Sequence, residues 1–410
     1  MCPSGFEGLR DGGVRGRRLL FIEPYERKNV KFGLKRFSFF AGALALVSSS
    51  LLLVDSQAAE PKSVYIVKFA DSVSVGNEIS AARSNGIAVR ESLEYVFKGF
   101  IGEMTPGQAN ALAKNPRVEI VEADSKVLAS TDRSGATWGL DRIDQQSLPL
   151  NNVYSYTTTG AGVTAYVIDT GIYASHSDFG GRVASGFSAI SDGNGTNDCN
   201  GHGTHVSGTI GGATYGVAPS VSLVPVRVLD CSGSGSISGV ISGLNWVAKN
   251  KKLPAVANMS LGGGPSTTLD QAVNNLINAG VTVVVAAGNS NADACRSSPS
   301  RVPAAITVGA TDSRDNRASF SNFGSCLDLF APGVNITSDW ISNTTATNTI
   351  SGTSMATPHV AGVVARYLQS NPNAQPSSVS TEIVGASLKN TVSSTGAKSP
   401  NRLLFRSSSS

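Results

Sequence analysis

Three short segments carry side chains whose types could perform nucleophilic catalysis. Asp169 lies within the sequence AYVIDTG, His202 within NGHGTH and Ser354 within SGTSMA. A serine hydroxyl becomes an effective nucleophile when an imidazole takes its proton, and a carboxylate orients that imidazole and stabilises its protonated form. The three segments therefore predict a triad, in the chain order Asp169, His202, Ser354, for acyl transfer at a carbonyl carbon.

Charge that develops on the carbonyl oxygen during such a reaction requires hydrogen-bond donors. Ser354 begins a long apolar helix predicted over residues 353–370, with Pro358 placed in its first turn, so free N–H groups and the helix dipole face the hydroxyl. Asn289 follows an apolar run and can offer its side-chain amide. We expect the Ser354 N–H and the Asn289 amide to form an oxyanion hole.

A parallel sheet covered by helices on both faces must position these groups. Apolar runs predict strands over residues 163–168, 222–228, 256–260, 281–286 and 306–308. Helical patterns alternate with them over residues 202–210, 236–249, 268–279 and 353–370. This alternation predicts an α/β fold, in which reacting groups collect at the carboxyl ends of strands and the amino ends of helices.

A smaller α+β unit precedes this one. Residues 63–127 predict a β-α-β-β-α-β order, with strands over 63–69, 89–97, 99–104 and 118–122, a helix over 76–85 and a second helix that starts near Pro106. The polar residues 130–137 are interpreted as a cleavable linker. The predicted domains are a leader over residues 1–58, the small unit over 59–130 and the larger unit over 131–410.

The leader resembles an export signal. Basic residues between positions 27 and 36 precede an apolar run over 37–54, and Ser56, Gln57 and Ala58 form a small-x-small cleavage pattern. The run is short for a membrane span, so a single-span anchor is the weaker alternative and no stable membrane association is expected. Because residues 1–29 fit neither a signal nor a fold, we hypothesise that translation starts at Val30.

Composition bounds the remaining classes of function. The chain of 410 residues has 15% charged residues and 40% hydrophobic residues, which is typical of a globular protein rather than a disordered one. The net charge is +4, and no run of Lys and Arg with interleaved aromatic residues follows the leader. These features argue against nucleic acid as a partner.

Four cysteines lie in the part expected to be exported: Cys199, Cys231, Cys295 and Cys326. They allow three disulfide pairings. The nearest-neighbour pairing, Cys199 with Cys231 and Cys295 with Cys326, would close two loops, each worth roughly 3 kcal/mol in the chain-entropy estimate. A zinc site is the weaker alternative, because the chain has no CxxC pair and only four histidines.

The other histidines have structural interpretations. His205 lacks a third metal ligand and is expected to be hydrogen-bonded inside the fold, and His359 follows Ser354 on the same predicted helix and is expected to pack there. His176 lies in a polar stretch and is given no catalytic role.

The motifs around Asp169, His202, Asn289 and Ser354 resemble the subtilase superfamily, in the same chain order. Residues 138–405 are most similar to its proteinase K branch and to the aqualysin type of bacterial secreted proteases. The resemblance implies a subtilisin-like fold, a serine endopeptidase activity and the nearest-neighbour disulfides. It also implies that residues 63–127 are a ferredoxin-like propeptide, an intramolecular chaperone and inhibitor removed by self-cleavage near residues 129–132.

Substrate contacts are implied by the same resemblance. Two segments are similar to the strands that hold an extended peptide by main-chain hydrogen bonds: Gly233, Ser234 and Gly235, and Ser260, Leu261, Gly262 and Gly263. Ala286, Ala287 and Gly288 resemble the floor of the primary specificity pocket, which holds the residue before the cut bond (P1). Because this floor has no charge, the resemblance implies broad specificity with apolar or aromatic residues at P1.

Structural calcium is the implied cofactor. Pro303 and Ala305, through their carbonyl oxygens, and the Asp328 carboxylate align with the family's tight site, and such hard oxygen ligands suit Ca²⁺. A second site is implied at Asp141, Asp144 and Gln145, although Asn151 stands where relatives have a further acidic ligand.

Two other functions fit the sequence less well. An α/β-hydrolase esterase would carry its triad in the order Ser, Asp, His with a Gly-x-Ser-x-Gly elbow, which the Ser354 segment lacks. A catalytically dead binding protein typically has a substituted triad. The sequence thus predicts a secreted, self-processing serine endopeptidase of polypeptides, a monomer when mature, whose own propeptide inhibits it.

Overall fold

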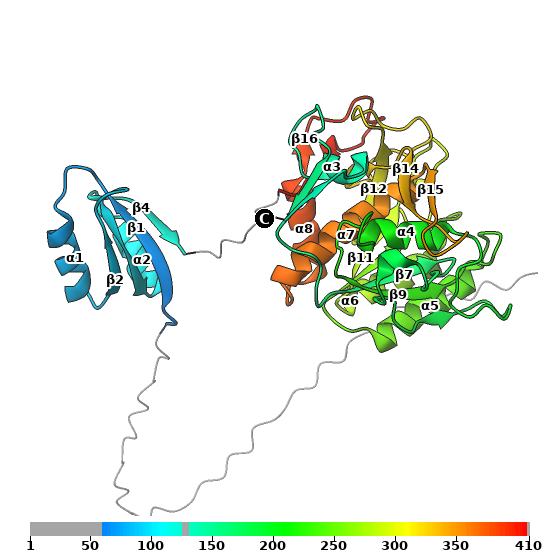
Figure 1. Ribbon diagram of the computed structural model, residues 1–410, viewed down its shortest axis with the longest axis horizontal. Coiled ribbons are helices and arrows are strands. Elements are labelled where there is room, and N and C mark those ends of the chain that lie inside the picture. The colour runs from blue at the N-terminus through cyan, green and yellow to red at the C-terminus, as the bar shows by residue number, and fades with distance from the viewer. Residues whose placement is uncertain (1–59, 125–130, 408–410) are drawn as a thin grey trace, which may run out of the picture. The chain divides into compact units, whose positions relative to one another are not determined.

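The computed structural model describes residues 60–124 and 131–407. It divides into two compact units, Met1–Ala123 and Asp124–Ser410, and each is treated by itself (Figure 1). The expected leader, with its signal and cleavage pattern, lies outside the described residues. Within the described residues, no helix has the length and apolar character needed to cross a membrane.

The small unit contains a four-stranded antiparallel sheet in the order β2-β3-β1-β4. Phe69 and Phe100 pack in its core, with ring centroids 5.7 Å apart. Helix α2 starts at Pro106 behind a capping box, in which Thr105 and Gln108 exchange side-chain and backbone hydrogen bonds. The predicted β-α-β-β-α-β order is confirmed: β1 (Ser63–Phe69), α1 (Val75–Ser84), β2 (Ala88–Leu93), β3 (Gly99–Met104), α2 (Pro106–Ala113) and β4 (Val118–Ala123).

The larger unit is built on a nine-stranded sheet in the order β16-β17-β13-β12-β11-β10-β7-β9-β8. Every neighbouring pair from β17 to β8 is parallel. The strands of this sheet are β7 (Thr164–Asp169), β8 (Phe187–Ser188), β9 (Ser222–Arg227), β10 (Ala255–Met259), β11 (Thr282–Ala286), β12 (Ile306–Thr311), β13 (Leu329–Pro332), β16 (Leu388–Lys389) and β17 (Arg402–Leu403).

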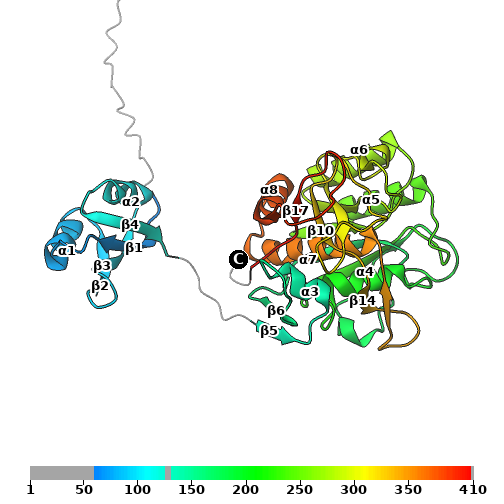
Figure 2. The same ribbon diagram turned by 90° about the horizontal axis from the view of Figure 1, so that it is seen from above.

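Helices cover both faces of this sheet, as expected for buried parallel strands. Helices α5 and α6 pack on one face and α4, α7 and α8 on the other. Figure 2 shows α5 and α6 on the opposite side of β10 from α4 and α7. The predicted α/β class is therefore confirmed. The helices are α3 (Trp138–Ile143), α4 (His202–Gly211), α5 (Ile237–Asn250), α6 (Thr267–Asn278), α7 (Thr353–Ser370) and α8 (Pro376–Ala386), with 3-10 turns η1 (Ser177–Phe179) and η2 (Ala294–Arg296).

Two short hairpins lie outside the main sheet. Strands β14 (Ile336–Asp339) and β15 (Thr347–Ile350) pair with each other, as do β5 (Thr131–Ser134) and β6 (Val153–Tyr156). The second hairpin corrects the interpretation of residues 130–137 as a linker. Ser155 and Tyr156 in β6 hydrogen-bond across to β5, so residues 131–134 belong to the larger unit.

A second correction concerns Pro358. Helix α7 begins at Thr353, which places Pro358 beyond the first turn rather than within it. Because proline has no N–H, the helix loses the hydrogen bond that would have ended on the carbonyl of Ser354. That carbonyl is therefore free to accept a bond from outside the helix.

Candidate active site

The end of strand β7 and the start of helix α4 bring Asp169 and His202 together. Asp169 is the last residue of β7 and is completely buried. His202 is the first residue of α4 and follows Gly201, whose φ of 105° lies in the left-handed region that favours glycine. A Cβ at Gly201 would also lie 2.5 Å from the Trp340 ring. This glycine therefore allows the tight turn into α4 that directs His202 toward the end of strand β7.

The imidazole of His202 is bonded and polarised by acidic neighbours. His202 Nδ1 lies 2.8 Å from Asp169 Oδ1, a bond that fixes the proton on Nδ1 and leaves Nε2 as the base. Burial lowers the pKa of His202, but the charge and hydrogen bond of Asp169, together with the charge of Asp198, raise it overall. The side chain is 26% exposed, so solvent and substrate can reach Nε2.

Asp198 is a site residue that the sequence analysis missed. Its buried carboxylate accepts bonds from the backbone of Asn200, Gly201 and Thr204 and from the hydroxyls of Thr170 and Thr204. It therefore ties the residue after Asp169 to the first turn of α4. An acidic residue shortly before a helix start was the available signal, since such residues often cap helices.

Ser354 is the second residue of α7, a helix that packs against α4. Its Oγ donates to the carbonyl of Ser260 at 3.1 Å, and Ser260 Oγ donates back to the Ser354 carbonyl at 2.9 Å. The second bond uses the carbonyl left free by Pro358. Within the described residues, no hydrogen bond joins Ser354 Oγ to His202, so the hydroxyl must turn when it reacts. Such loose geometry is common before substrate binds.

The side-chain amide of Asn289 is oriented by the start of helix α7. Its Oδ1 accepts bonds from the N–H and the Oγ1 of Thr353, both at 2.8 Å. Because a backbone N–H can only donate, this contact identifies Oδ1 as the acceptor and leaves Nδ2 to donate. The N–H of Ser354, in the first turn of α7, has no carbonyl to bond within the helix. The two donors therefore lie at the same helix start.

Two cavities meet at these groups. One, of about 340 Å³, is lined by Ala286, Ala287, Gly288, Asn289 and Ser354, and no charged residue lines it. The other, of about 530 Å³, is lined by His202 and by apolar side chains that include Leu229 and Leu269. Both share the wall formed by residues 261–264. The nucleophile and the base therefore open onto one continuous cleft.

The two segments expected to hold a peptide face this cleft. Gly233, Ser234 and Gly235 line the larger cavity together with Ser260, Leu261, Gly262 and Gly263. Neither segment belongs to a strand of the sheet, apart from a single bridge between Gly263 and Ser298. Gly233 and Ser234 bond back to Asp230, and Gly263 exchanges backbone bonds with Ser298. Among the described residues, the backbone groups of Gly235 and Gly262 have no partner, so an extended chain could use them.

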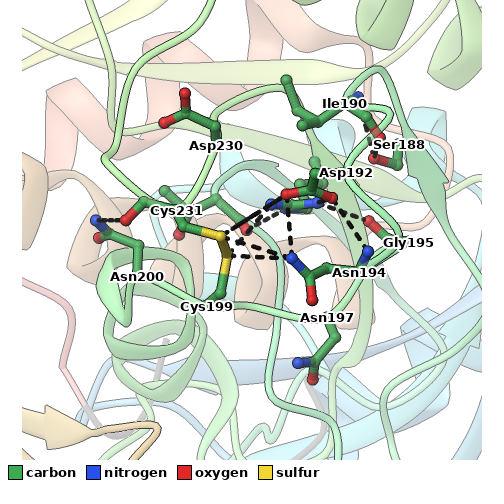
Figure 3. Close-up of polar contacts among 12 residues, drawn as sticks. Ser188, Ile190, Asp192, Asn194, Gly195, Asn197, Cys199, Asn200, Asp230 and Cys231 are labelled. Carbon is green, nitrogen blue, oxygen red and sulfur yellow. Dashed lines mark hydrogen bonds and ion pairs between the residues drawn. A yellow bond between two sulfur atoms is a disulfide. The ribbon is translucent and has the colours of Figure 1, made fainter.

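The nearest-neighbour disulfides are confirmed. Cys199 bonds to Cys231 and Cys295 bonds to Cys326. Figure 3 shows the first bridge beside Asn200, close to the start of α4. Asp192 lies close to both sulfurs of this bridge, but the disulfide consumes the thiols that would bind a metal.

Asp328 fits the expected calcium site in its chemistry. Burial raises the pKa of Asp328 to about 6, and the Thr307 N–H is its one hydrogen-bond donor within the described residues. A buried carboxylate with so little compensation suits a cation. The carbonyls of Pro303 and Ala305 precede β12, which pairs with β13 just after Asp328.

The residues of the second expected calcium site lie close together and hydrogen-bond to one another. Gln145 Nε2 donates to Asp141 Oδ1 and, at 2.9 Å, to Asn151 Oδ1. Asp144 Oδ1 is buried without a partner, and burial, with the charge of Asp141, raises the pKa of Asp144 to about 6. This orphaned oxygen is the feature that favours a cation here.

The other histidines play structural parts. His205 Nε2 lies 3.0 Å from the Ile336 carbonyl and His359 Nδ1 lies 2.9 Å from the Met355 carbonyl. Burial lowers the pKa of each to about 4, so both are neutral. His176, which lies in a polar stretch of the sequence, is buried, with Nδ1 3.5 Å from Asp339 Oδ1.

Family models match both units of the chain. The model described as "Subtilase family" matches residues 160–404, and the model described as "Peptidase inhibitor I9" matches residues 64–129. The first match spans more than half of the chain and includes Asp169, His202, Asn289 and Ser354.

Relatives and a solved structure agree with these matches. The chain is 60% identical over 320 residues to the "Extracellular serine proteinase" of Thermus sp. (strain Rt41A), covering 78% of each chain. It is 53% identical over 325 residues to the "Alkaline serine exoprotease A" of Vibrio alginolyticus, covering 78% of this chain and 60% of that one. A cold-adapted subtilisin-like serine proteinase of known structure has 57% identity and a TM-score of 0.65, over 66% of this chain and 98% of the other.

Proposed function

The chain belongs to the subtilase family of serine endopeptidases and carries an I9-type propeptide domain, and on that premise we propose that Asp169, His202 and Ser354 hydrolyse peptide bonds. The observation that carries the proposal is the 2.8 Å bond from His202 Nδ1 to Asp169 Oδ1, made at the start of α4, a helix that packs against the helix of Ser354.

The proposed reaction follows from the contacts of these groups. When a peptide carbonyl enters the cleft, the Ser354 hydroxyl leaves the Ser260 carbonyl and gives its proton to His202 Nε2 while Oγ attacks the carbonyl carbon. Asn289 Nδ2 and the Ser354 N–H bind the oxyanion. His202 then protonates the leaving amine as the C–N bond breaks. Water attacks the acyl-enzyme while His202 takes its proton, and His202 returns that proton to Ser354 Oγ as the bond from Oγ to the acyl carbon breaks and the acid product leaves.

Specificity is proposed from the two cavities. The uncharged floor at Ala286, Ala287 and Gly288 favours apolar or aromatic residues before the cut bond. Gly235 and Gly262 can contribute main-chain bonds that any sequence can form, so the enzyme should cut many proteins. The family membership and the positions of these residues at the cavity together support the oxyanion and specificity roles proposed here.

We infer that the protein is exported as a zymogen. The "Extracellular" name of the Thermus relative and the signal-like leader support export. The I9 domain supports an intramolecular inhibitor. Cleavage should fall before Thr131, because a cut inside β5 would break its pairing with β6.

Subtilases generally bind structural calcium, and the residues present fit it. We propose that Pro303, Ala305 and Asp328 hold one ion, and that Asp141, Asp144 and Gln145 hold a second. A bound ion would neutralise the Asp328 carboxylate and the unpartnered Oδ1 of Asp144, and would stabilise the native fold.

The test of the active-site assignment is the Ser354→Ala variant, with Ser351→Ala as the matched control. Ser351 is the neighbouring exposed serine, and its hydroxyl bonds Asn335 rather than the site. Casein clearing and labelling by a serine-directed phosphonate should vanish with Ser354→Ala and persist with Ser351→Ala. Clearing that survives in Ser354→Ala would refute the assignment, and an unlabelled, inactive wild type would indicate a binding protein.

Self-processing has a separate readout. If the enzyme cuts its own chain, Ser354→Ala should accumulate as the full-length precursor and become processed when a trace of active enzyme is added. A variant that matures normally by itself would show that another protease removes the small unit.

A further inference from the structure

The chain contains three Asn–Gly steps in its described part, and such steps are chemically unstable. The nitrogen of the glycine can attack the asparagine side-chain carbonyl, because glycine has no Cβ to obstruct the approach. The steps are Asn85–Gly86, Asn194–Gly195 and Asn200–Gly201. Since the attacking nitrogen must be free, its hydrogen bond decides which step can react.

Two of the three steps are protected. The N–H of Gly86 donates to the Arg83 carbonyl at 3.0 Å. The N–H of Gly201 donates to Asp198 Oδ1 at 2.9 Å, and the side chain of Asn200 is itself held by two hydrogen bonds. Reaction at either step would have to break these bonds first.

The Asn194–Gly195 step lacks the protection at the glycine nitrogen. The side chain of Asn194 is held, because its Nδ2 donates to Asp192 Oδ2 at 3.1 Å and to both sulfurs of the Cys199–Cys231 bridge. The three steps therefore differ at the attacking nitrogen. Both residues are exposed, and a turn is closed by the bond from the Asn197 N–H to the Asn194 carbonyl at 3.0 Å. Gly195 has φ of 57°, and in the described residues its N–H has no acceptor. The attacking group is therefore open to solvent and already placed in a tight turn.

This turn is connected to the candidate active site through Arg227. Figure 3 shows Asn194 beside Asp192, whose two oxygens each lie 2.6 Å from the Arg227 guanidinium. Arg227 is completely buried, and it donates to the Gly195 carbonyl at 3.3 Å and to the Thr170 carbonyl at 3.1 Å. Thr170 directly follows Asp169, so one guanidinium spans the turn and the triad strand.

We propose that Asn194 is a site of spontaneous deamidation whose conversion disturbs Arg227 and, through it, the strand that carries Asp169. The Gly195 nitrogen forms a bond to the Asn194 side-chain carbon, and ammonia leaves, which gives a cyclic imide. Water then opens the imide at either carbonyl, which yields aspartate or isoaspartate and involves no oxidant or reductant.

Both products change the same contacts. Asn194 Nδ2 donates to Asp192 Oδ2 at 3.1 Å, and the new carboxylate replaces that donor with a like charge beside Asp192. Isoaspartate also lengthens the backbone ahead of the Gly195 carbonyl. The buried Arg227 then loses part of the arrangement that fixes it against the Thr170 carbonyl.

The chemistry is tested on the full chain carrying Ser354→Ala, which prevents self-digestion. The protein is aged at mildly alkaline pH and its peptides are mapped for isoaspartate. Conversion should be several-fold faster at Asn194 than at Asn85 and Asn200, and it should be absent from the same chain with Asn194→Gln or Asn194→Ser. Equal or faster conversion at either protected step would overturn the proposal.

The functional consequence rests on the proposed protease activity and has its own test. Active enzyme is aged under a reversible active-site inhibitor, which is then removed. The wild type should lose kcat in proportion to its isoaspartate at position 194, whereas Asn194→Gln and Asn194→Ser, active at time zero, should not. Conversion without loss of kcat would refute the link to Asp169 but not the proposed function, which the unaged enzyme reports.

Discussion

The two halves of the candidate site differ in charge. The half that carries the base contains Asp169, Asp198 and Arg227, which are buried and hydrogen-bonded. The half that carries the nucleophile offers hydroxyls and amides, from Ser354 and Asn289 among others, around a cavity lined by no charged residue. One half is therefore built from buried charged groups, and the other from uncharged hydroxyls and amides.

The difference between the two halves corresponds to how long each one must stabilise a charge during the proposed reaction. The imidazolium of His202 recurs in each step of the proposed reaction, so permanent carboxylates can be placed to stabilise it. The oxyanion exists only briefly, so neutral donors that cost little when no substrate is bound suffice. The hydroxyl of Ser354 rests on the Ser260 carbonyl until a substrate arrives.

The largest effect that would test this comparison is expected from the neutral half. Asn289→Ala removes one oxyanion donor and should lower kcat by about 10²–10³-fold with little change in KM. Thr353→Ser, which keeps the hydroxyl bonded to Asn289 Oδ1, is the control and should retain most activity. A fall confined to KM would place Asn289 in substrate binding instead.

A change in the ionic half should move a pH profile. Asp198→Asn removes a negative charge that raises the pKa of His202. Because the base must be unprotonated, the acidic limb of kcat/KM should move to lower pH. Losing a carboxylate oxygen that accepts from backbone N–H groups should also cost about 1–3 kcal/mol of stability, measured by denaturant unfolding. An unchanged limb in a folded variant would contradict an electrostatic role for Asp198.

Metal removal tests a carboxylate outside both halves of the site, Asp328, which is proposed to bind calcium. If calcium at Asp328 is present at about 100 times its Kd, chelation should cost about 3 kcal/mol and lower Tm by roughly 5–10 °C. In Asp328→Asn, the wild-type response to chelator should be reduced. A wild type indifferent to chelator would argue against both proposed ions.

The last prediction concerns stability alone and a buried acid outside the ionic half, Asp339, for which no effect on catalysis is expected. Burial and the charge of Asp178 raise the pKa of Asp339 to about 8, partly opposed by Arg182. An unfolded aspartate titrates near 4, so the folded chain holds a proton that the unfolded chain releases between about pH 4 and 8. The stability from Asp339 is therefore complete below pH 4 and is lost as the pH rises through 8.

Asp339→Asn keeps the shape and removes this titration. Its Tm should fall less than that of the wild type between pH 5 and 8, as followed by thermal melts. His176, Asp178 and Tyr215 also face this acid, so His176→Gln distinguishes the contribution of the imidazole. Parallel Tm curves for wild type and Asp339→Asn would show that Asp339 stays ionised.

Long buried strands and the triad segments were predictable from the sequence. Runs such as residues 281–286 contain only apolar or β-branched residues and Ala, and β11 differs from the prediction by one residue. Helix α7 begins and ends as predicted, because Gly352 and Asn371 bound a continuous apolar pattern.

Contacts between distant segments were not predictable in the same way. The five bonds of Asp198 and the exchange between Ser260 and Ser354 depend on how loops meet in space, which periodicity does not encode. The shortest elements, such as β16 and β17, have two residues each and give no pattern. Residues 131–134 read as linker because they are polar, yet their backbone pairs with β6.

That pairing has a consequence for the life of the processed chain. A cut before Thr131 would create a new amino terminus that already belongs to a hairpin, and Arg133 fastens it further through the carbonyls of Thr214 and Gly216. Aminopeptidases need a terminal segment whose backbone is not hydrogen-bonded, so that it can enter their active site. The new amino terminus would have no such free backbone, so the processed protein should resist digestion by aminopeptidases.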